Sequence, residues 1–86
     1  MKRSDIKVGT IYRREPTKDY KGNQFFKITA VRDDHSDVSE WIPSTQSWED
    51  RAELRLKHKY MMEDRRIKLS PLEVIVMFAE DYDEEI

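Results

Sequence analysis

Residues 25–32 constrain the fold most, because their side chains alternate as a β-strand requires, with aromatic and β-branched residues throughout. The same period of two predicts an earlier strand over residues 6–14 and a third strand over 38–42, which Pro43 ends. Turn-forming residues separate the three stretches. The sequence therefore predicts an antiparallel meander, in which successive strands lie side by side.

Residues 49–66 fit both a helix and a strand. Helix propensity is high there, and apolar residues recur every four positions. Between residues 54 and 60, however, aliphatic or aromatic groups and a histidine alternate with three cations, as in a half-buried strand. We therefore favour a strand, followed by a turn over 61–66 and a last short strand over 67–69.

The C-terminal part carries a clear helix start signal. Ser70 and Glu73 form a capping box around Pro71, which predicts a helix beginning at Pro71. Its inner stripe is expected to consist of four residues: Leu72, Ile75, Val76 and Ala79. Further apolar residues make the helix apolar nearly all round, so that it is either buried on several sides or docks on another surface.

An acidic tail is expected to follow the helix. Residues 80–86 carry five carboxylates, and negative charge at a helix C-terminus opposes the helix dipole. The helix is therefore expected to fray by about Tyr82 and the tail to be mobile. This leaves one small domain over residues 1–79.

Together these elements predict an α+β domain: a small, strongly curved antiparallel barrel of four or five strands, closed by the C-terminal helix. Residues 8–14, 25–31 and 69–75 resemble a loose family of short single-barrel proteins with the Src-homology-3-like fold, common among bacteriophage accessory proteins. The shared patterns are a strand after a glycine, a strand after a loop and a capped closing helix. The resemblance implies a binding module, and a phage protein acting on a host factor, but carries over no functional residues.

Catalytic and metal chemistry find little support in the residue types. There is no cysteine, which excludes a disulfide framework and thiolate metal sites. Gly9 and Gly22 are the only glycines, too few for a phosphate-cradling loop. His35 and His58 stand in no nucleophile motif, and the acidic turn over residues 33–37 lacks the glycine of a calcium loop. We expect neither an enzyme nor a cofactor, and no metal.

Charge is strongly segregated along the chain. Residues 1–32 hold nine basic and three acidic groups, and residues 51–68 hold seven and three. Residues 33–50 and 69–86 each hold six acidic groups and no basic one, so a formal net charge of −2 hides four blocks of alternating sign. Such blocks are typical of surfaces that pair with each other or with a partner.

The expected function is non-enzymatic binding of another macromolecule, most simply a host protein or a second copy of the chain. The residues expected at that interface are aromatic or adaptable apolar groups: Trp41, Trp48, Tyr60, Met77 and Phe78. The alternative is RNA or DNA binding by a cationic sheet face, with these residues: Arg13, Arg14, Lys27, Arg55, Lys57 and Lys59. The acidic tail would then regulate binding or imitate a nucleic acid.

The chain shows no targeting signal. Its longest apolar run is far too short to cross a bilayer, and no apolar stretch of signal-peptide length follows the N-terminus. We therefore expect a cytoplasmic protein without a membrane partner, in the host cytoplasm if it is phage-encoded.

Overall fold

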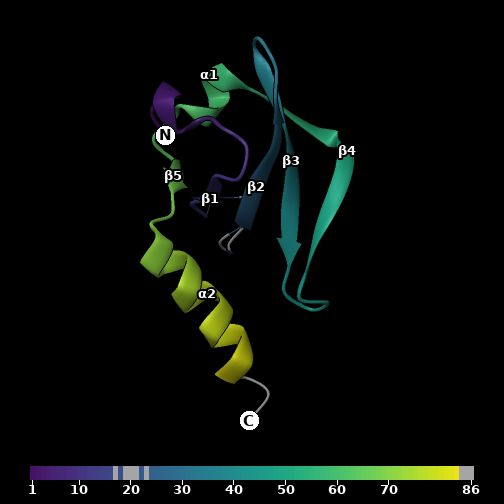
Figure 1. Ribbon diagram of the computed structural model, residues 1–86, viewed down its shortest axis with the longest axis vertical. Helices are drawn as coiled ribbons and strands as arrows, with labels where there is room; N and C mark the ends of the chain where they lie inside the picture. Colours follow the sequence, from purple (N-terminus) through teal and green to yellow (C-terminus); the bar gives the residue numbers. More distant parts are fainter. Residues whose placement is uncertain (17, 19–21, 23, 84–86) are drawn as a thin grey trace.

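The computed structural model describes residues 1–16, 18, 22 and 24–83, without the side chains of 51–54 and 78–83. Figure 1 shows the strands gathered in one sheet and the long C-terminal helix extending beyond it from the end of the last strand. The elements follow in this order: a short 3-10 helix η1 (Arg3–Asp5), β1 (Ile11–Arg14), β2 (Gln24–Val31), β3 (His35–Ile42), β4 (Ser47–Lys57), α1 (His58–Met61), β5 (Arg66–Lys68) and α2 (Pro71–Asp83).

The five strands form one antiparallel sheet in the order β4-β3-β2-β1-β5. The α+β class and the C-terminal helix are therefore confirmed. The expected strongly curved barrel is wrong, because the described strands form an open sheet with β4 and β5 at its two edges. Closure would require these two edges to pair. They are poorly matched for that, since β4 has 11 residues and β5 only 3.

The strand and helix alternatives for the middle of the chain resolve in favour of a strand. β4 extends through Lys57 and pairs with β3, with Leu56 opposite Ser36. The alternation stops at His58, where α1 begins, so the half-buried strand does not extend to residue 60 as predicted, and the Tyr60 side chain is exposed. The buried His58 connects the start of α1 to β3, because its Nε2 lies 2.9 Å from Ser36 Oγ.

The main core lies on one face of the sheet. Tyr12 and Phe26 are opposite each other on β1 and β2, and their stacked rings lie 5.3 Å apart. Ile28 and Val38 continue this face on β2 and β3. Met61 of α1, which is fully buried, packs against the same cluster. The short β1 begins at Ile11, later than predicted, because residues 3–10 are taken up by η1 and a turn through Gly9, whose φ is +94°.

α2 begins at Pro71 as predicted. Both bonds of the capping box are present, since the Ser70 amide donates to Glu73 Oε1 and the Glu73 amide donates to Ser70 Oγ, each at 3.2 Å. The helix remains regular to Asp83, so the expected fraying by Tyr82 is not seen; residues 84–86 lie outside the described chain.

The predicted inner stripe of α2 is wrong. Leu72, Ile75 and Val76 are exposed, whereas Met77 is buried; the side chain of Ala79 lies outside the described set. In a helix that is apolar nearly all round, periodicity shows which residues share a face but not which face turns toward the sheet.

Candidate functional site

Three large apolar side chains stand exposed in a row on α2. Leu72 is 69% exposed, Ile75 is 63% exposed and Val76 is 48% exposed. Residues three and four positions apart are neighbours on one side of a helix, so these side chains form one continuous apolar stripe. We call Leu72, Ile75 and Val76 the α2 stripe. Contiguous exposed apolar surface of this kind is a mark of interaction sites.

A groove adjoins the α2 stripe. It has a volume of about 310 Å³ and lies between the first turns of α2 and the sheet face opposite the main core. Phe25 and Arg13 line it from the sheet, and Leu72 and Val76 line it from the helix. The stripe therefore continues into a concave apolar surface, which can receive a side chain of a partner.

The charged residues of α2 itself all have one sign, although Arg13 of β1 lines the adjoining groove. The segment over residues 69–86 holds six acidic residues and no basic one. Glu73 lies in the first turn of α2, and three of the helix's last four residues are acidic. A surface that binds this helix would gain from Lys or Arg at its edge, because complementary charge favours encounter and register.

The two tryptophans predicted for an interface lie opposite each other in the β3–β4 hairpin. Trp41 and Trp48 are opposite each other in the register, and their ring centroids lie 5.3 Å apart. Trp41 is buried and Trp48 is half-buried. Lys27 Nζ lies 4.8 Å from the centroid of the Trp48 ring, a cation–π contact.

The other predicted interface residues do not join the tryptophans in one surface. Tyr60 is exposed on α1, with Lys59 Nζ 5.0 Å from its ring centroid, and Figure 1 shows α1 and α2 at opposite ends of the molecule. Met77 is buried, and the side chain of Phe78 lies outside the described set. The two α2 residues predicted for an interface are therefore not among the residues of this helix that are found exposed, Leu72, Ile75 and Val76.

The six predicted nucleic-acid contacts divide between several places. Alternation along the strands puts four of them on the face opposite the main core: Arg13, Lys27, Arg55 and Lys57. Arg14, the neighbour of Arg13 on β1, points to the core face, and Lys59 lies on α1. The six cations therefore do not form a single surface.

Most of the four cations that share a face interact with another side chain of the same molecule. Arg13 Nη1 lies 3.9 Å from Glu15 Oε1, and Arg55 Nε lies 3.7 Å from Asp37 Oδ1. Lys27 is engaged by Trp48, as described above. Asp37 also accepts a 2.9 Å bond from Arg32 Nη2, and this hydrogen bond lowers the pKa of Asp37. The positive charge of this sheet face is therefore partly neutralised by carboxylates of the same molecule.

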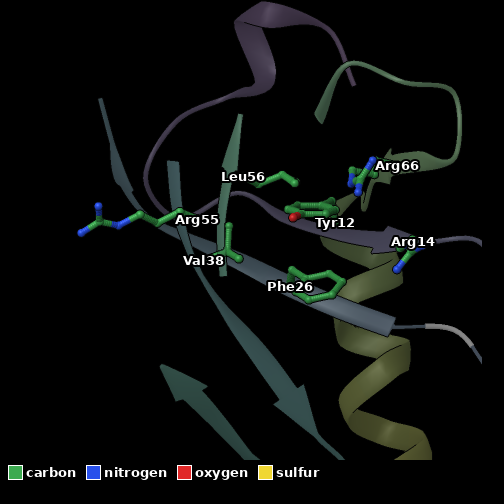
Figure 2. A pocket seen from close by; sticks show the side chains of 7 residues that line it. All are labelled: Tyr12, Arg14, Phe26, Val38, Arg55, Leu56 and Arg66. Carbon is green, nitrogen blue, oxygen red and sulfur yellow. The ribbon is translucent and has the colours of Figure 1, made fainter. Parts of the chain in front are cut away.

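A second concave site lies on the core face of the sheet. It is a cavity of about 190 Å³ beside Tyr12. Figure 2 shows Tyr12, Phe26, Val38 and Leu56 pointing toward one another, with Arg14 and Arg66 on one side and Arg55 extending away on the other. We call this the Tyr12 cavity. Sequence reasoning missed Arg66, because only the β1–β5 pairing brings it opposite Arg14.

Burial governs the electrostatics of the Tyr12 cavity. It raises the pKa of the Tyr12 hydroxyl to about 12, so this group stays protonated at neutral pH. Burial also lowers the pKa of Arg66, and the nearby Arg14 acts in the same direction. The cavity thus combines aromatic walls, a neutral phenol and two closely placed guanidinium groups.

Comparisons with known proteins gave no match to a family model, to a curated protein or to a solved structure. No helix of the described chain is long and apolar enough to cross a membrane.

Proposed function

We propose that the protein is a non-enzymatic binding module that docks on another protein through the α2 stripe. The observation that supports this most is the exposure of Leu72, Ile75 and Val76 on a well-capped helix. Burying such a side chain releases about 1.5–3 kcal/mol. Three of them, with the adjoining groove, provide the apolar centre that a specific interface needs.

The chemistry of α2 points to a different protein rather than a second copy. Two α2 helices placed face to face would bring acidic residues of both chains together, because the whole segment over 69–86 is acidic. Like charges at an interface oppose association. The expected partner carries an apolar surface edged with Lys or Arg. We propose that this partner is a host protein that the module regulates or inhibits.

Affinity capture with matched variants tests this function. The chain has no cysteine, so a Ser4→Cys substitution allows the full-length protein to be biotinylated and immobilised at a single exposed position outside α2. The immobilised protein is incubated with a bacterial lysate in three forms: the parent, Ile75→Asp and Val8→Asp. Val8 is 65% exposed but lies before β1, which makes Val8→Asp a control for an added surface charge.

We expect one protein to be captured by the parent and by Val8→Asp but not by Ile75→Asp. With the purified partner, Leu72→Ala should raise the Kd about 5- to 150-fold, the effect of a hot-spot residue worth about 1–3 kcal/mol. All variants should unfold near the parent's Tm, because exposed positions contribute little to stability. Equal capture by parent and Ile75→Asp, or a dimer of the isolated chain in light scattering, would overturn the proposal.

A further inference from the structure

Two arginines face each other across β1 and β5. Arg14 and Arg66 are register partners in the antiparallel pair, which places their Cβ atoms about 5 Å apart. Like charges at directly opposite positions destabilise a sheet. Such a pair is stabilised when a negative group lies between the two guanidinium groups, because each can then donate a charge-assisted hydrogen bond.

Arg14 is linked to the negative charge of Glu40 only through Gln24, whose Nε2 donates to Glu40 Oε1 at 3.2 Å. Arg14 Nη1 donates to the neutral side chain of Gln24 at 3.3 Å, and its buried Nε has no hydrogen-bond partner. Among the described residues, no ion pair includes Arg14. Arg66 is better satisfied, since its Nη1 donates to the Tyr60 carbonyl at 2.8 Å and lies 3.7 Å from Glu63 Oε2. A buried donor without a partner costs free energy, so Arg14 is the group that a ligand would satisfy.

Apart from Arg55, whose side chain extends away from it, the rest of the lining of the Tyr12 cavity is apolar. Phe26, Val38 and Leu56 form its walls together with the Tyr12 ring. Its volume of about 190 Å³ is comparable to that of apolar cavities, about 150 Å³, that admit benzene. An inorganic anion would leave these walls without contacts. A ligand with one aromatic ring and one oxyanion would use both parts of the cavity.

We propose that the Tyr12 cavity binds a small aromatic oxyanion, an aryl phosphate or aryl carboxylate, with the oxyanion between Arg14 and Arg66 and the ring against Phe26, Val38 and Leu56. The site lies on the core face of the sheet, opposite the face that carries the groove beside α2, and does not depend on the partner proposed above.

Titration of the full-length protein with four compounds tests the site: phenyl phosphate, benzoate, inorganic phosphate and benzyl alcohol. Calorimetry or NMR shifts of the cavity residues give the affinity. We expect saturable binding of phenyl phosphate or benzoate with a Kd of about 1 mM or tighter. Inorganic phosphate and benzyl alcohol, which each offer only half of the chemistry, should bind at least about tenfold more weakly. Affinity for the aryl oxyanion should fall as salt is raised.

Neighbouring arginines on β1 provide a matched pair of variants. Arg14→Gln should weaken phenyl phosphate or benzoate binding by roughly tenfold or more, the effect of one charge-assisted bond. Arg13→Gln, one residue away on the opposite face, should leave it unchanged. Without ligand, Arg14→Gln should melt at the parent's Tm or higher, because it removes a like-charge contact.

Several results would overturn the site. One is equal affinity of the parent and Arg14→Gln for phenyl phosphate or benzoate. Another is binding of benzyl alcohol as tight as that of these two compounds. The third is that neither phenyl phosphate nor benzoate binds. A lower Tm for Arg14→Gln without ligand would also count against it, because Arg14 would then be a satisfied structural group. Ile75→Asp should bind phenyl phosphate or benzoate as the parent does, so failure of this site and failure of the α2 stripe are distinguishable.

Discussion

At the scale of single residues, the most constrained side chain is Tyr12. It is 1% exposed, stacks on Phe26 and lies beside Arg66 in the cavity. A phenolate here would be a desolvated charge, which is why burial raises the pKa of Tyr12 to about 12. The ordinary value, 10.0, applies when the chain is unfolded. The fold therefore favours the protonated hydroxyl, and this stabilisation is complete only below pH 10.

Tyr12→Phe tests this linkage. As pH rises from 10 to 12, the unfolded tyrosine ionises before the folded one, so the parent should lose about 2 kcal/mol of unfolding free energy from this group. Tyr12→Phe lacks the hydroxyl and should lose less over the same interval. Urea denaturation at several pH values measures the two slopes. Equal slopes would contradict the buried position of the Tyr12 hydroxyl.

At the scale of elements, α2 combines strong local signals with weak tertiary contact. Its first turn is fixed by Ser70 and Glu73, whose reciprocal bonds satisfy amides that a helix start leaves open. Of the described side chains in its middle, Met77 is buried, while the α2 stripe remains exposed. A helix of this kind depends on its cap more than a buried helix does.

Ser70→Ala should therefore loosen α2 without disturbing the sheet. Loss of an N-cap costs about 1 kcal/mol, so amide hydrogen exchange in the first turns of α2 should become about fivefold faster. Exchange in β2 and β3 should stay as in the parent. Ser44→Ala, in the exposed turn between β3 and β4, is the control and should change neither region. Unchanged exchange in α2 would show that the capping box contributes nothing in solution.

At the scale of the whole molecule, α2 makes the protein elongated. The radius of gyration is 13.0 Å, against about 12 Å for a compact chain of this length, and the extents are 44 × 28 × 25 Å. The accessible surface is 6131 Å², where roughly 5,400 Å² is typical of a monomer of this mass. The excess is what an extended helix with an uncovered apolar side produces, and it agrees with a molecule completed by a partner.

Among the side chains that the structure describes, the main core cluster contains none of α2, so a chain ending at Ser70 should retain the sheet. We expect its far-UV circular dichroism to keep the β signal and its unfolding free energy to fall by about 2–3 kcal/mol, since contacts of buried Met77 are lost. It should also lose partner capture. Leu69→Ala in the full chain removes a buried side chain next to α2 but keeps the helix. Its unfolding free energy therefore shows how much is lost when packing beside α2 is weakened and the helix itself remains. Complete unfolding of the shortened chain would show that α2 belongs to the folding core.

What the sequence by itself determined were local features. The strand over Gln24–Val31 and the start of α2 at Pro71 follow from alternation and from side chains bonding amides three residues away. These interactions join neighbours in the chain, so a short window contains all the information that they need.

Only the tertiary structure decided which surfaces face outward. The open sheet, the exposure of Ile75 rather than Met77, and the opposition of Arg14 and Arg66 all depend on how β5 pairs with β1, more than 50 residues earlier. Pairings of this kind are selected by competition among whole arrangements of the chain, because each buries apolar surface at the cost of closing a long loop. The balance of those two free energies is a property of the complete fold, and no segment of the sequence contains it.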